Sequence, residues 1–283
     1  MSNMSIKSAP PGPPRTLSPS RASDFMRCPL LYRYRTIDRL AEPPSAAAMR
    51  GRLVHLVLEA LFDLPRADRS PQAAQDLVEP AYERLMDDDA RLDQLFADGR
   101  LTPEAFIGEA RDLVNAYFDL EDPTRLIPEA RELLVEAQLD GGPTLRGYID
   151  RLEVAPGSGL IRIADYKTGK SPAPRFQAET MFQLRFYALI LWLTRGQIPA
   201  QVLLLYLGNR DKITAAPTSG DLERTRLRIE TIWREIQRMV AAGDFPPVKG
   251  PLCGWCSFQA QCPLFGGVPP SFPLPVQGLS EAA

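Results

Sequence analysis

Apolar residues recur with two different periods along the chain, and the change falls near Pro128. Before it, apolar positions return at helical spacing, most clearly in residues 49–64. After it, short apolar stretches bounded by glycine and proline predict strands over residues 133–139, 145–154 and 160–165. Further helices are predicted at 17–40 (interrupted at Cys28-Pro29), 71–121, 176–195 and 222–242, and further strands at 201–207 and 213–216.

The order of these elements predicts an α/β fold: helices come first, then a meander, a helix, a strand and a last helix. We expect a mixed central sheet flanked by helices and wrapped by an N-terminal helical region. The predicted organisation is a disordered leader (1–16), a single domain (17–265) and a flexible tail (266–283). Within the domain we expect a helical insertion at 65–128, a core at 129–242 and a cysteine-bearing segment at 253–262.

The apolar content is sufficient for a core but not for a membrane span. The chain has 283 residues, of which 45% are hydrophobic. Its longest uninterrupted apolar run, Phe186–Leu193, is far shorter than the roughly 20 residues that cross a bilayer. The N-terminus lacks the apolar stretch of a signal peptide. We therefore expect a soluble, cytoplasmic protein with no membrane partner.

Charge is distributed unevenly, although the net charge is only −2. Between Arg15 and Arg52 there are eight arginines against three acids, whereas Asp76 to Glu136 holds 17 acids and six arginines. The basic N-terminal stretch, together with the arginines of residues 222–242, could therefore meet nucleic acid. Solvated helix faces that merely carry arginine are an equally good interpretation of the charge pattern.

Residues 162–171, RIADYKTGKS, allow two kinds of chemistry. Gly169-Lys170-Ser171 after a strand resembles the end of a phosphate-binding loop, which requires G-x-x-x-x-G-K-[ST] and a following helix. Here Ala164 stands where the first glycine belongs, and two prolines within the next three residues oppose a helix. This pattern argues against a phosphate loop.

The second interpretation is a metal site with a lysine beside it. Asp165 and Lys167 are two apart on a strand and so share a face. If the preceding strand brings Asp150 opposite Asp165, the two carboxylates repel unless a cation lies between them, and Mg²⁺ or Mn²⁺ suits such oxygen ligands. Lys167 would then orient or deprotonate a water on the metal, or stabilise transition-state charge. The alternative is a simple salt bridge at a strand edge.

Several further polar residues could converge on the same site. His55, the sole histidine, lies one helical turn before Glu59. Glu136 lies on the strand before Asp150, and Gln183 and Tyr187 lie one turn apart on the helix after Asp165. Each of these signals is weak by itself.

Six motifs occur in the order found in the RecB-like branch of the PD-(D/E)xK nuclease superfamily, which the chain resembles over residues 17–264. They are Ser18-Pro19-Ser20-Arg21 with Cys28-Pro29 and Tyr32-x-Tyr34-Arg35, Gly51-x3-His55-x2-Leu58-Glu59, Gly147-x2-Asp150-Arg151, Asp165-Tyr166-Lys167-Thr168-Gly169, Gln183-x3-Tyr187, and Cys253-x2-Cys256-x5-Cys262-Pro263.

This resemblance implies roles for the site residues. His55, Asp150 and Asp165 would bind the metal, and Lys167 would be catalytic. Glu136 is similar to the extra acid that the family carries at the rim of its active site. Gln183 and Tyr187 are similar to the motif that contacts DNA and supports the site.

The four cysteines form a possible ligand set of their own: Cys28, Cys253, Cys256 and Cys262. Four thiolates suit either zinc or an iron–sulfur cluster, and the spacing does not decide between them. The resemblance implies a 4Fe–4S cluster, as in family members with one early cysteine and a late C-x2-C-x5-C. Either ligand would close a loop of more than two hundred residues and stabilise the domain.

The function expected from these features is a divalent-metal-dependent DNA exonuclease, acting on single-stranded DNA or DNA ends in repair or recombination. Phe25, Tyr32 and Tyr34 are candidates for stacking on bases, although core packing suits at least two of them better. Unwinding would require a helicase partner, because no helicase motor fits in this chain. The alternatives are a nuclease of CRISPR adaptation and a non-catalytic, cluster-bearing DNA-binding subunit.

Overall fold

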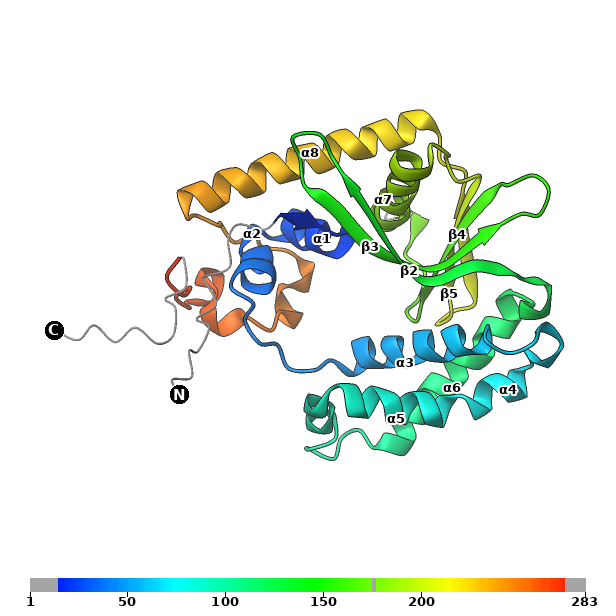
Figure 1. Cartoon of the computed structure of the whole chain (residues 1–283). Helices are drawn as coiled ribbons and strands as arrows, with labels where there is room; N and C mark the ends of the chain where they lie inside the picture. The colour runs from blue at the N-terminus through cyan, green and yellow to red at the C-terminus, as the bar shows by residue number, and fades with distance from the viewer. Residues whose placement is uncertain (1–14, 175–176, 273–283) are drawn as a thin grey trace, which may run out of the picture. The chain divides into compact units, whose positions relative to one another are not determined.

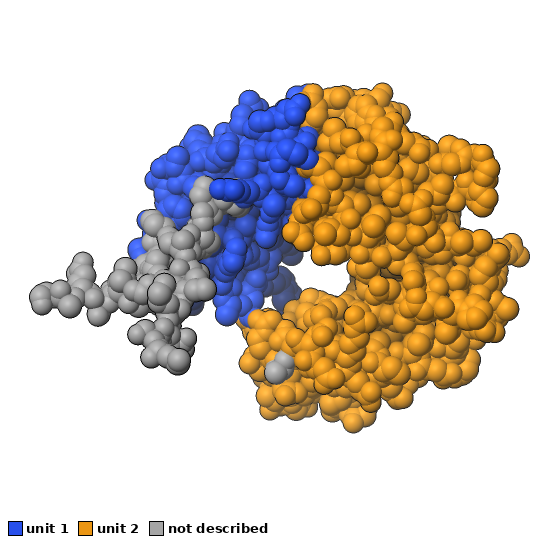
Figure 2. All heavy atoms as spheres, viewed as in Figure 1, with its two compact units in different colours: residues 1–42, 138–145, 227–283 blue, residues 43–137, 146–226 orange. Residues whose placement is uncertain are grey.

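The computed structural model describes residues 15–174 and 177–272 of the chain. Two compact units are found, shown in separate colours in Figure 2. The first combines residues 1–42, 138–145 and 227–283, and the second combines residues 43–137 and 146–226. Most of the predicted leader (1–16) and part of the predicted tail (266–283) lie outside the described residues.

Six strands form one mixed sheet, which is visible at the centre of Figure 1. The path is β1-β3-β4-β5-β6, with β2 paired to β3 outside it. β3 and β4 are antiparallel, β4 and β5 are parallel, and β5 and β6 are antiparallel. The strands are β1 (Thr16–Leu17), β2 (Pro128–Gln138), β3 (Thr144–Val154), β4 (Ile161–Lys167), β5 (Gln201–Tyr206) and β6 (Asp211–Ala215).

The helices follow the predicted order. Their bounds are α1 (Pro19–Arg27), α2 (Pro29–Tyr32), the π-helix η1 (Arg33–Ile37), α3 (Ala46–Leu61), α4 (Pro71–Asp76), α5 (Val78–Asp88), α6 (Pro103–Leu120), α7 (Gln177–Arg195) and α8 (Ser219–Ala242). Short 3₁₀ turns lie at Arg66–Asp68, Ala90–Leu95, Pro123–Arg125, Pro251–Trp255, Gln259–Gln261 and Pro263–Phe265. No helix among the described residues combines the length and apolar character that a bilayer crossing needs.

Local capping explains where several helices begin. Ser18, Ser45, Ser70 and Thr102 each have extended backbone and accept a hydrogen bond from the N–H three residues later. Such a side chain satisfies one of the amides that the first turn leaves unpaired. Proline follows at the first position of α1, α4 and α6, where no amide hydrogen is needed. Ser18 and Pro19 together therefore define the start of α1.

Helices cover both faces of the sheet in the second unit (Figure 1). Alternate residues of β4 and β5, Ala164, Tyr166, Leu203 and Leu205, join a buried cluster with α3, α5 and α6. The intervening residues face α7, as the hydrogen bond from Gln183 to Asp165 shows. The mixed central sheet flanked by helices that the sequence predicted is confirmed.

No helix follows Ser171 directly, as a phosphate-binding loop would require. The backbone after Lys167 is irregular, and α7 begins only at Gln177. The structure therefore agrees with rejecting that interpretation of residues 162–171.

In the first unit, a buried arginine links the N-terminal helical segment to residues 270–272. Arg33, only 4% exposed, makes an ion pair with Asp38 at 2.9 Å and donates to the carbonyl oxygens of Pro270 (2.6 Å) and Ser271 (3.0 Å). Its guanidinium also lies 5.0 Å from the centre of the Phe272 ring. A buried cation needs such partners, and these fix residues 270–272 against the N-terminal helical segment.

Gly147 provides a direct test of packing between β3 and α7. A Cβ placed there would lie 2.5 Å from Cε1 of Tyr187, whose side chain is buried. We predict that Gly147→Ala lowers the free energy of unfolding by about 1–3 kcal/mol, because the ring must move. Gly108→Ala is the matched control. It lies in α6 with nothing within 4 Å of the added methyl, and should raise stability by about 0.5–1 kcal/mol. Urea unfolding of both variants measures the difference, and equal stability of Gly147→Ala and wild type would contradict this packing.

Candidate active site

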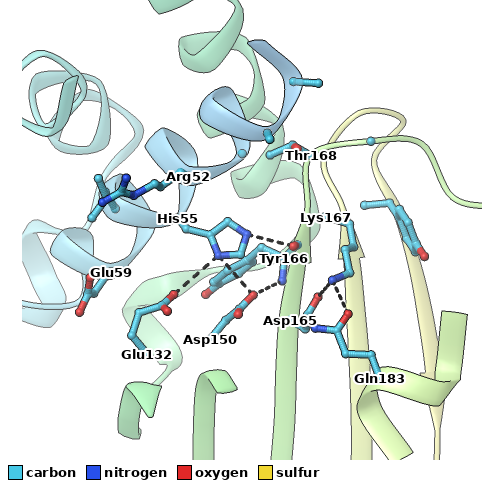
Figure 3. Close-up of a pocket in the computed structure, with 16 residues that line it drawn as sticks. Arg52, His55, Glu59, Glu132, Asp150, Asp165, Tyr166, Lys167, Thr168 and Gln183 are labelled. Carbon is cyan, nitrogen blue, oxygen red and sulfur yellow. Dashed lines mark hydrogen bonds and ion pairs between the residues drawn. The ribbon is translucent and has the colours of Figure 1, made fainter. Parts of the chain in front are cut away.

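A pocket of about 660 Å³ lies among α3, the sheet and α7 in the second unit (Figure 3). Four acids and two permanent cations line it, so negative charge is in excess. These charged side chains are Arg52, Glu59, Glu132, Asp150, Asp165 and Lys167, with His55 among them.

The backbone of Tyr166, the last residue but one of β4, organises one side of this pocket. Its N–H donates to Oδ2 of Asp150 at 2.7 Å, and its carbonyl oxygen lies 3.1 Å from Nε2 of His55. The pairing of β3 with β4 ends at Arg151 and Ala164, so the carboxylate of Asp150 takes an amide that a neighbouring strand would otherwise bind. The strands thus separate where the acidic side chains enter the pocket.

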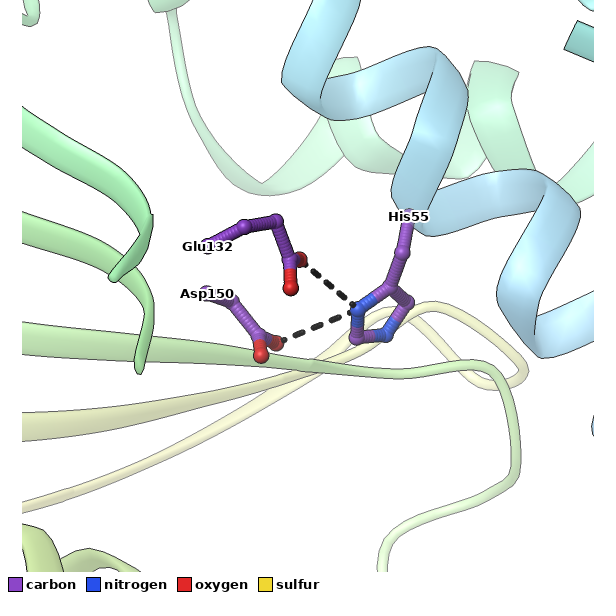
Figure 4. A group of neighbouring side chains, drawn as sticks. All are labelled: His55, Glu132 and Asp150. Atoms are coloured by element: carbon purple, nitrogen blue, oxygen red, sulfur yellow. Dashed lines mark ion pairs between the residues drawn. The ribbon is translucent and has the colours of Figure 1, made fainter. Parts of the chain in front are cut away.

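The hydrogen bond to Tyr166 also determines which nitrogen of His55 can bind an ion. A carbonyl oxygen only accepts, so Nε2 carries the hydrogen and Nδ1 is the atom available as a ligand. Nδ1 lies 3.5 Å from Asp150 Oδ2 and 3.6 Å from Glu132 Oε1, as Figure 4 shows. The ligand atoms of these three residues all lie within 4.8 Å of one another.

These three residues fit a divalent cation by the chemistry of their donors. Carboxylate oxygens suit Mg²⁺ and Mn²⁺, and an imidazole nitrogen favours a transition ion such as Mn²⁺. His55 keeps its other nitrogen bound to a carbonyl, the support that ligating histidines usually have.

The charges of the pocket perturb its ionisable groups in the direction expected for such a site. Burial lowers the pKa of His55, but the hydrogen bond to Glu132 and the charges of Asp150 and Asp165 outweigh it, so that the pKa rises to about 9. Burial, then the charge of Asp165, raises the pKa of Asp150 well above its usual value. Bringing these acids together therefore costs free energy, which a cation offsets.

On the opposite side of the pocket, Lys167 and Asp165 form a held pair. Lys167 Nζ lies 2.6 Å from Asp165 Oδ2 and donates to Gln183 Oε1 at 2.8 Å. Gln183 Nε2 donates in turn to Asp165 Oδ1 at 2.7 Å and to the Tyr187 hydroxyl at 3.1 Å. The Gln183 amide from α7 thus orients both Asp165 and Lys167. These three residues and Tyr187, all predicted as site residues, lie together.

Lys167 stays charged in this setting. Burial lowers its pKa, but the charge and hydrogen bond of Asp165 and the charge of Asp150 more than compensate, so the net shift is upward. An ammonium with this partner is suited to stabilising negative charge rather than to removing a proton at neutral pH.

The extra acid of the pocket is Glu132, which the sequence did not indicate. Glu136 instead makes an exposed ion pair with Arg146 at 3.3 Å and does not line the pocket. Glu132 has a left-handed backbone, with a φ of 43°, and its carboxylate lies 3.6 Å from Nδ1 of His55. Its neighbour Arg131 holds β2 to the end of α3, donating to the Glu59 carbonyl and to Asp63.

Arg151 supports the site from beneath. It is fully buried and donates to the hydroxyl of Tyr166 at 2.6 Å, to Glu121 at 2.6 Å and to Glu153 at 2.7 Å. The Tyr117 hydroxyl lies 3.3 Å away. Because a buried guanidinium is costly to leave unpaired, this set fixes β3, β4 and α6 relative to one another.

The four cysteines all belong to the first unit and are free and partly buried. The N–H of Val248 donates to Cys28 Sγ at 3.4 Å, and the N–H of Gly250 donates to Cys253 Sγ at 3.2 Å. Burial raises the pKa of Tyr34 to about 12, although the positive charge of Arg33 lowers it. Negative charge on Cys262 and Cys28 adds to the rise. Two sequence-distant cysteines therefore lie near one tyrosine. Among the described residues, groups of three ligand atoms within 4.8 Å of one another include no cysteine.

The predicted nucleic-acid contacts of the N-terminal region are partly corrected. Phe25, Tyr32 and Tyr34 are only 7%, 0% and 1% exposed, so they pack in the core and cannot stack on a base. Three of the five arginines predicted for the last helix pair with an acid one turn earlier: Arg224 with Asp221, Arg226 with Glu223 and Arg238 with Glu235. Arg35 pairs with Asp24 and Glu42. Much of this basic charge is neutralised locally.

Comparison with known proteins identifies the family. The chain is 28% identical to Gene 69 protein of Mycobacterium phage L5 over 287 residues, covering 88% of this chain and 96% of that protein. It is 27% identical to Gene 69 protein of Mycobacterium phage D29 over 275 residues, with the same coverage. The crystal structure of "Putative exonuclease" from Eubacterium rectale has a similar fold, with a TM-score of 0.56 and 16% identity over 86% of this chain and 87% of that one. The model of the PD-(D/E)XK nuclease superfamily matches residues 16–263, and the chain therefore belongs to that superfamily.

Proposed function

We propose that this chain is a divalent-metal-dependent exonuclease that hydrolyses phosphodiester bonds in single-stranded DNA or at DNA ends. The family supplies the general chemistry, metal-dependent cleavage of nucleic acid. The observation that carries the proposal is the meeting of His55, Asp150 and the Asp165–Lys167 pair in one pocket. The order of the sequence motifs supports the RecB-like branch.

His55, Asp150 and Glu132, whose ligand atoms lie within 4.8 Å of one another, would hold the cation. Asp165, which the resemblance implies as a ligand, would provide a further carboxylate from the other side of the pocket. A bound Mg²⁺ or Mn²⁺ supplies Lewis acidity toward a phosphoryl oxygen and lowers the pKa of a bound water. The imidazole favours Mn²⁺ at least as well as Mg²⁺. The Tyr166 carbonyl keeps His55 oriented, and the Tyr166 amide keeps Asp150 oriented.

Lys167 would act on the charge that develops during cleavage. Its ammonium is held by Gln183 and Asp165, so it needs little rearrangement to bind a phosphoryl oxygen in the transition state. Tyr187 supports this arrangement through Gln183. The position of this amine beside the acids is what makes the pocket suited to phosphodiester hydrolysis.

The four cysteines would hold a 4Fe–4S cluster, a ligand proposed from the resemblance of their spacing. Backbone amides donate to the sulfurs of Cys28 and Cys253, and such hydrogen bonds stabilise a thiolate.

Removing the Asp165 charge tests the active site. We predict that Asp165→Asn or Lys167→Met lowers cleavage of end-labelled single strands at least about 100-fold in Mg²⁺ or Mn²⁺, with binding largely retained. Asp119→Asn breaks an exposed ion pair with Arg210 and is the matched control, expected to cleave normally. Chelation of the metal should stop wild-type cleavage. Cleavage at the wild-type rate by either site variant would overturn this assignment, and binding without any cleavage by wild type would favour a non-catalytic DNA-binding subunit.

Two glutamates on β2 are candidates for the extra acid of the active site: Glu136, predicted from the sequence, and Glu132, which lines the pocket. Glu132→Gln should weaken metal-dependent cleavage about 10- to 100-fold, because this carboxylate faces the metal ligands. Glu136→Gln should change the rate less than about twofold, since Glu136 pairs with Arg146 away from the pocket. Cleavage is measured as a function of Mn²⁺ concentration. The reverse result would restore Glu136 as the extra acid.

The cluster is tested by metal content after anaerobic purification. We expect about four iron atoms per chain, an iron–sulfur absorbance band and little zinc. Cys28→Ala and Cys256→Ala should lose the iron and unfold at lower temperature, because the constraint between the chain ends is lost. Asp165→Asn should retain the cluster. Stoichiometric zinc without iron would replace the cluster with a zinc site.

A further inference from the structure

The outward face of β3 leads away from the active-site pocket. Buried and exposed residues alternate from Leu145 to Ile149, with Arg146 and Tyr148 exposed and Gly147 buried. In a strand, residues two apart share a face, so Asp150 continues the series of Arg146 and Tyr148. Tyr148 therefore lies one step, about 7 Å along the strand, from a carboxylate of the proposed metal site.

β2 places an apolar side chain beside this tyrosine. Gln138 and Glu136 of β2 contact Thr144 and Arg146 of β3. Continued by two residues, this antiparallel register brings Leu134 opposite Tyr148. Tyr148 is 50% exposed and Leu134 is 40% exposed.

An exposed aromatic ring is unusual in this unit. Among the described residues, the exposed large hydrophobic side chains include three aromatic ones, Tyr148, Trp255 and Phe265. Trp255 and Phe265 lie in the unit of the cysteines, whereas Tyr148 lies in the unit that contains the pocket. The aromatic residues first considered for base stacking are buried, and Tyr148 is accessible next to the site.

We propose that Tyr148, with Leu134 at its side, is the platform on which the unpaired base next to the scissile phosphate stacks. This inference rests on the proposed nuclease function. Continuity with the pocket identifies a DNA strand as the ligand of this surface. If the scissile phosphate lies at the proposed metal site of Asp150, the neighbouring base comes within reach of the Tyr148 ring, and the next phosphate lies near Arg146. Alternation of a ring with a cation is typical of surfaces that bind single-stranded nucleic acid without reading its sequence.

The platform explains a preference for single strands or frayed ends. In a duplex both faces of each base are covered by neighbouring bases, so no face is free for Tyr148. An unpaired base can leave its stack at little cost in free energy, because stacking on the Tyr148 ring replaces stacking on the neighbouring base. Tyr148 thereby becomes a binding residue that selects the form of the substrate.

The test uses short single-stranded oligonucleotides in which one nucleotide at a time is abasic. Wild type should show a KM increase of about 5- to 100-fold when the abasic position falls beside the scissile phosphate, with kcat changed less. Tyr148→Ala should raise KM by a similar factor on intact strands and no longer respond to the abasic position. Tyr148→Phe, which keeps the ring, should behave like wild type. Leu160→Ala, a side chain of similar exposure in the same unit, is the control and should leave KM unchanged.

The outcomes separate this inference from the proposed function. Metal-dependent cleavage by wild type with no abasic effect, or equal KM values for Tyr148→Ala and wild type, overturns the platform while the nuclease assignment stands. A loss of kcat in both Tyr148→Ala and Tyr148→Phe also overturns it, because that pattern indicates a role for the hydroxyl. If wild type cleaves no substrate in any metal, the proposed function itself fails.

Discussion

The candidate active site depends on Tyr166, chiefly through its backbone, while its ring packs edge-on against that of His55. Tyr166 gives its amide to Asp150 and its carbonyl oxygen to His55, and its hydroxyl accepts from the buried Arg151. The two backbone contacts fix the side chains of Asp150 and His55, and the third fixes the strand that carries Tyr166. Arg151 cannot shift without leaving a buried charge unpaired, so the rigidity of the sheet passes directly to the site.

This rigidity is needed because the site is electrostatically unfavourable by itself. Four acids line one pocket. Both burial and the negative charge of Asp165 raise the pKa of Asp150. The fold compensates with His55 on one side and Lys167 on the other, each held by a polar partner. Stability and the proposed function therefore oppose each other here, because the acids that repel one another are the groups suited to a divalent cation.

The sequence was sufficient for most elements and for the residues whose positions follow from regular geometry, but not for the two-residue strand β1, which lies where a leader and the start of a helix were predicted. Asp165 and Lys167 share a face because strands have a period of two, and Gln183 and Tyr187 lie together because helices return after four residues. The mixed sheet followed from glycine- and proline-bounded apolar runs. Exposure was harder: Tyr32 and Tyr148 have the same chemistry, yet one is fully buried and the other half exposed. That difference depends on tertiary packing, which no local pattern contains.

The choice between Glu136 and Glu132 shows where regular geometry stops being a guide. By alternation the two glutamates are equivalent, since both lie on the same face of an ideal strand. The left-handed backbone at Glu132, which costs a non-glycine residue on the order of 1–3 kcal/mol, breaks that equivalence. Such a cost persists only where neighbouring contacts impose it, and Arg131, bound to the end of α3, is placed to do so. A strained acid beside the only histidine, next to an arginine that binds the end of α3, is a stronger sign of a functional carboxylate than its spacing in the sequence.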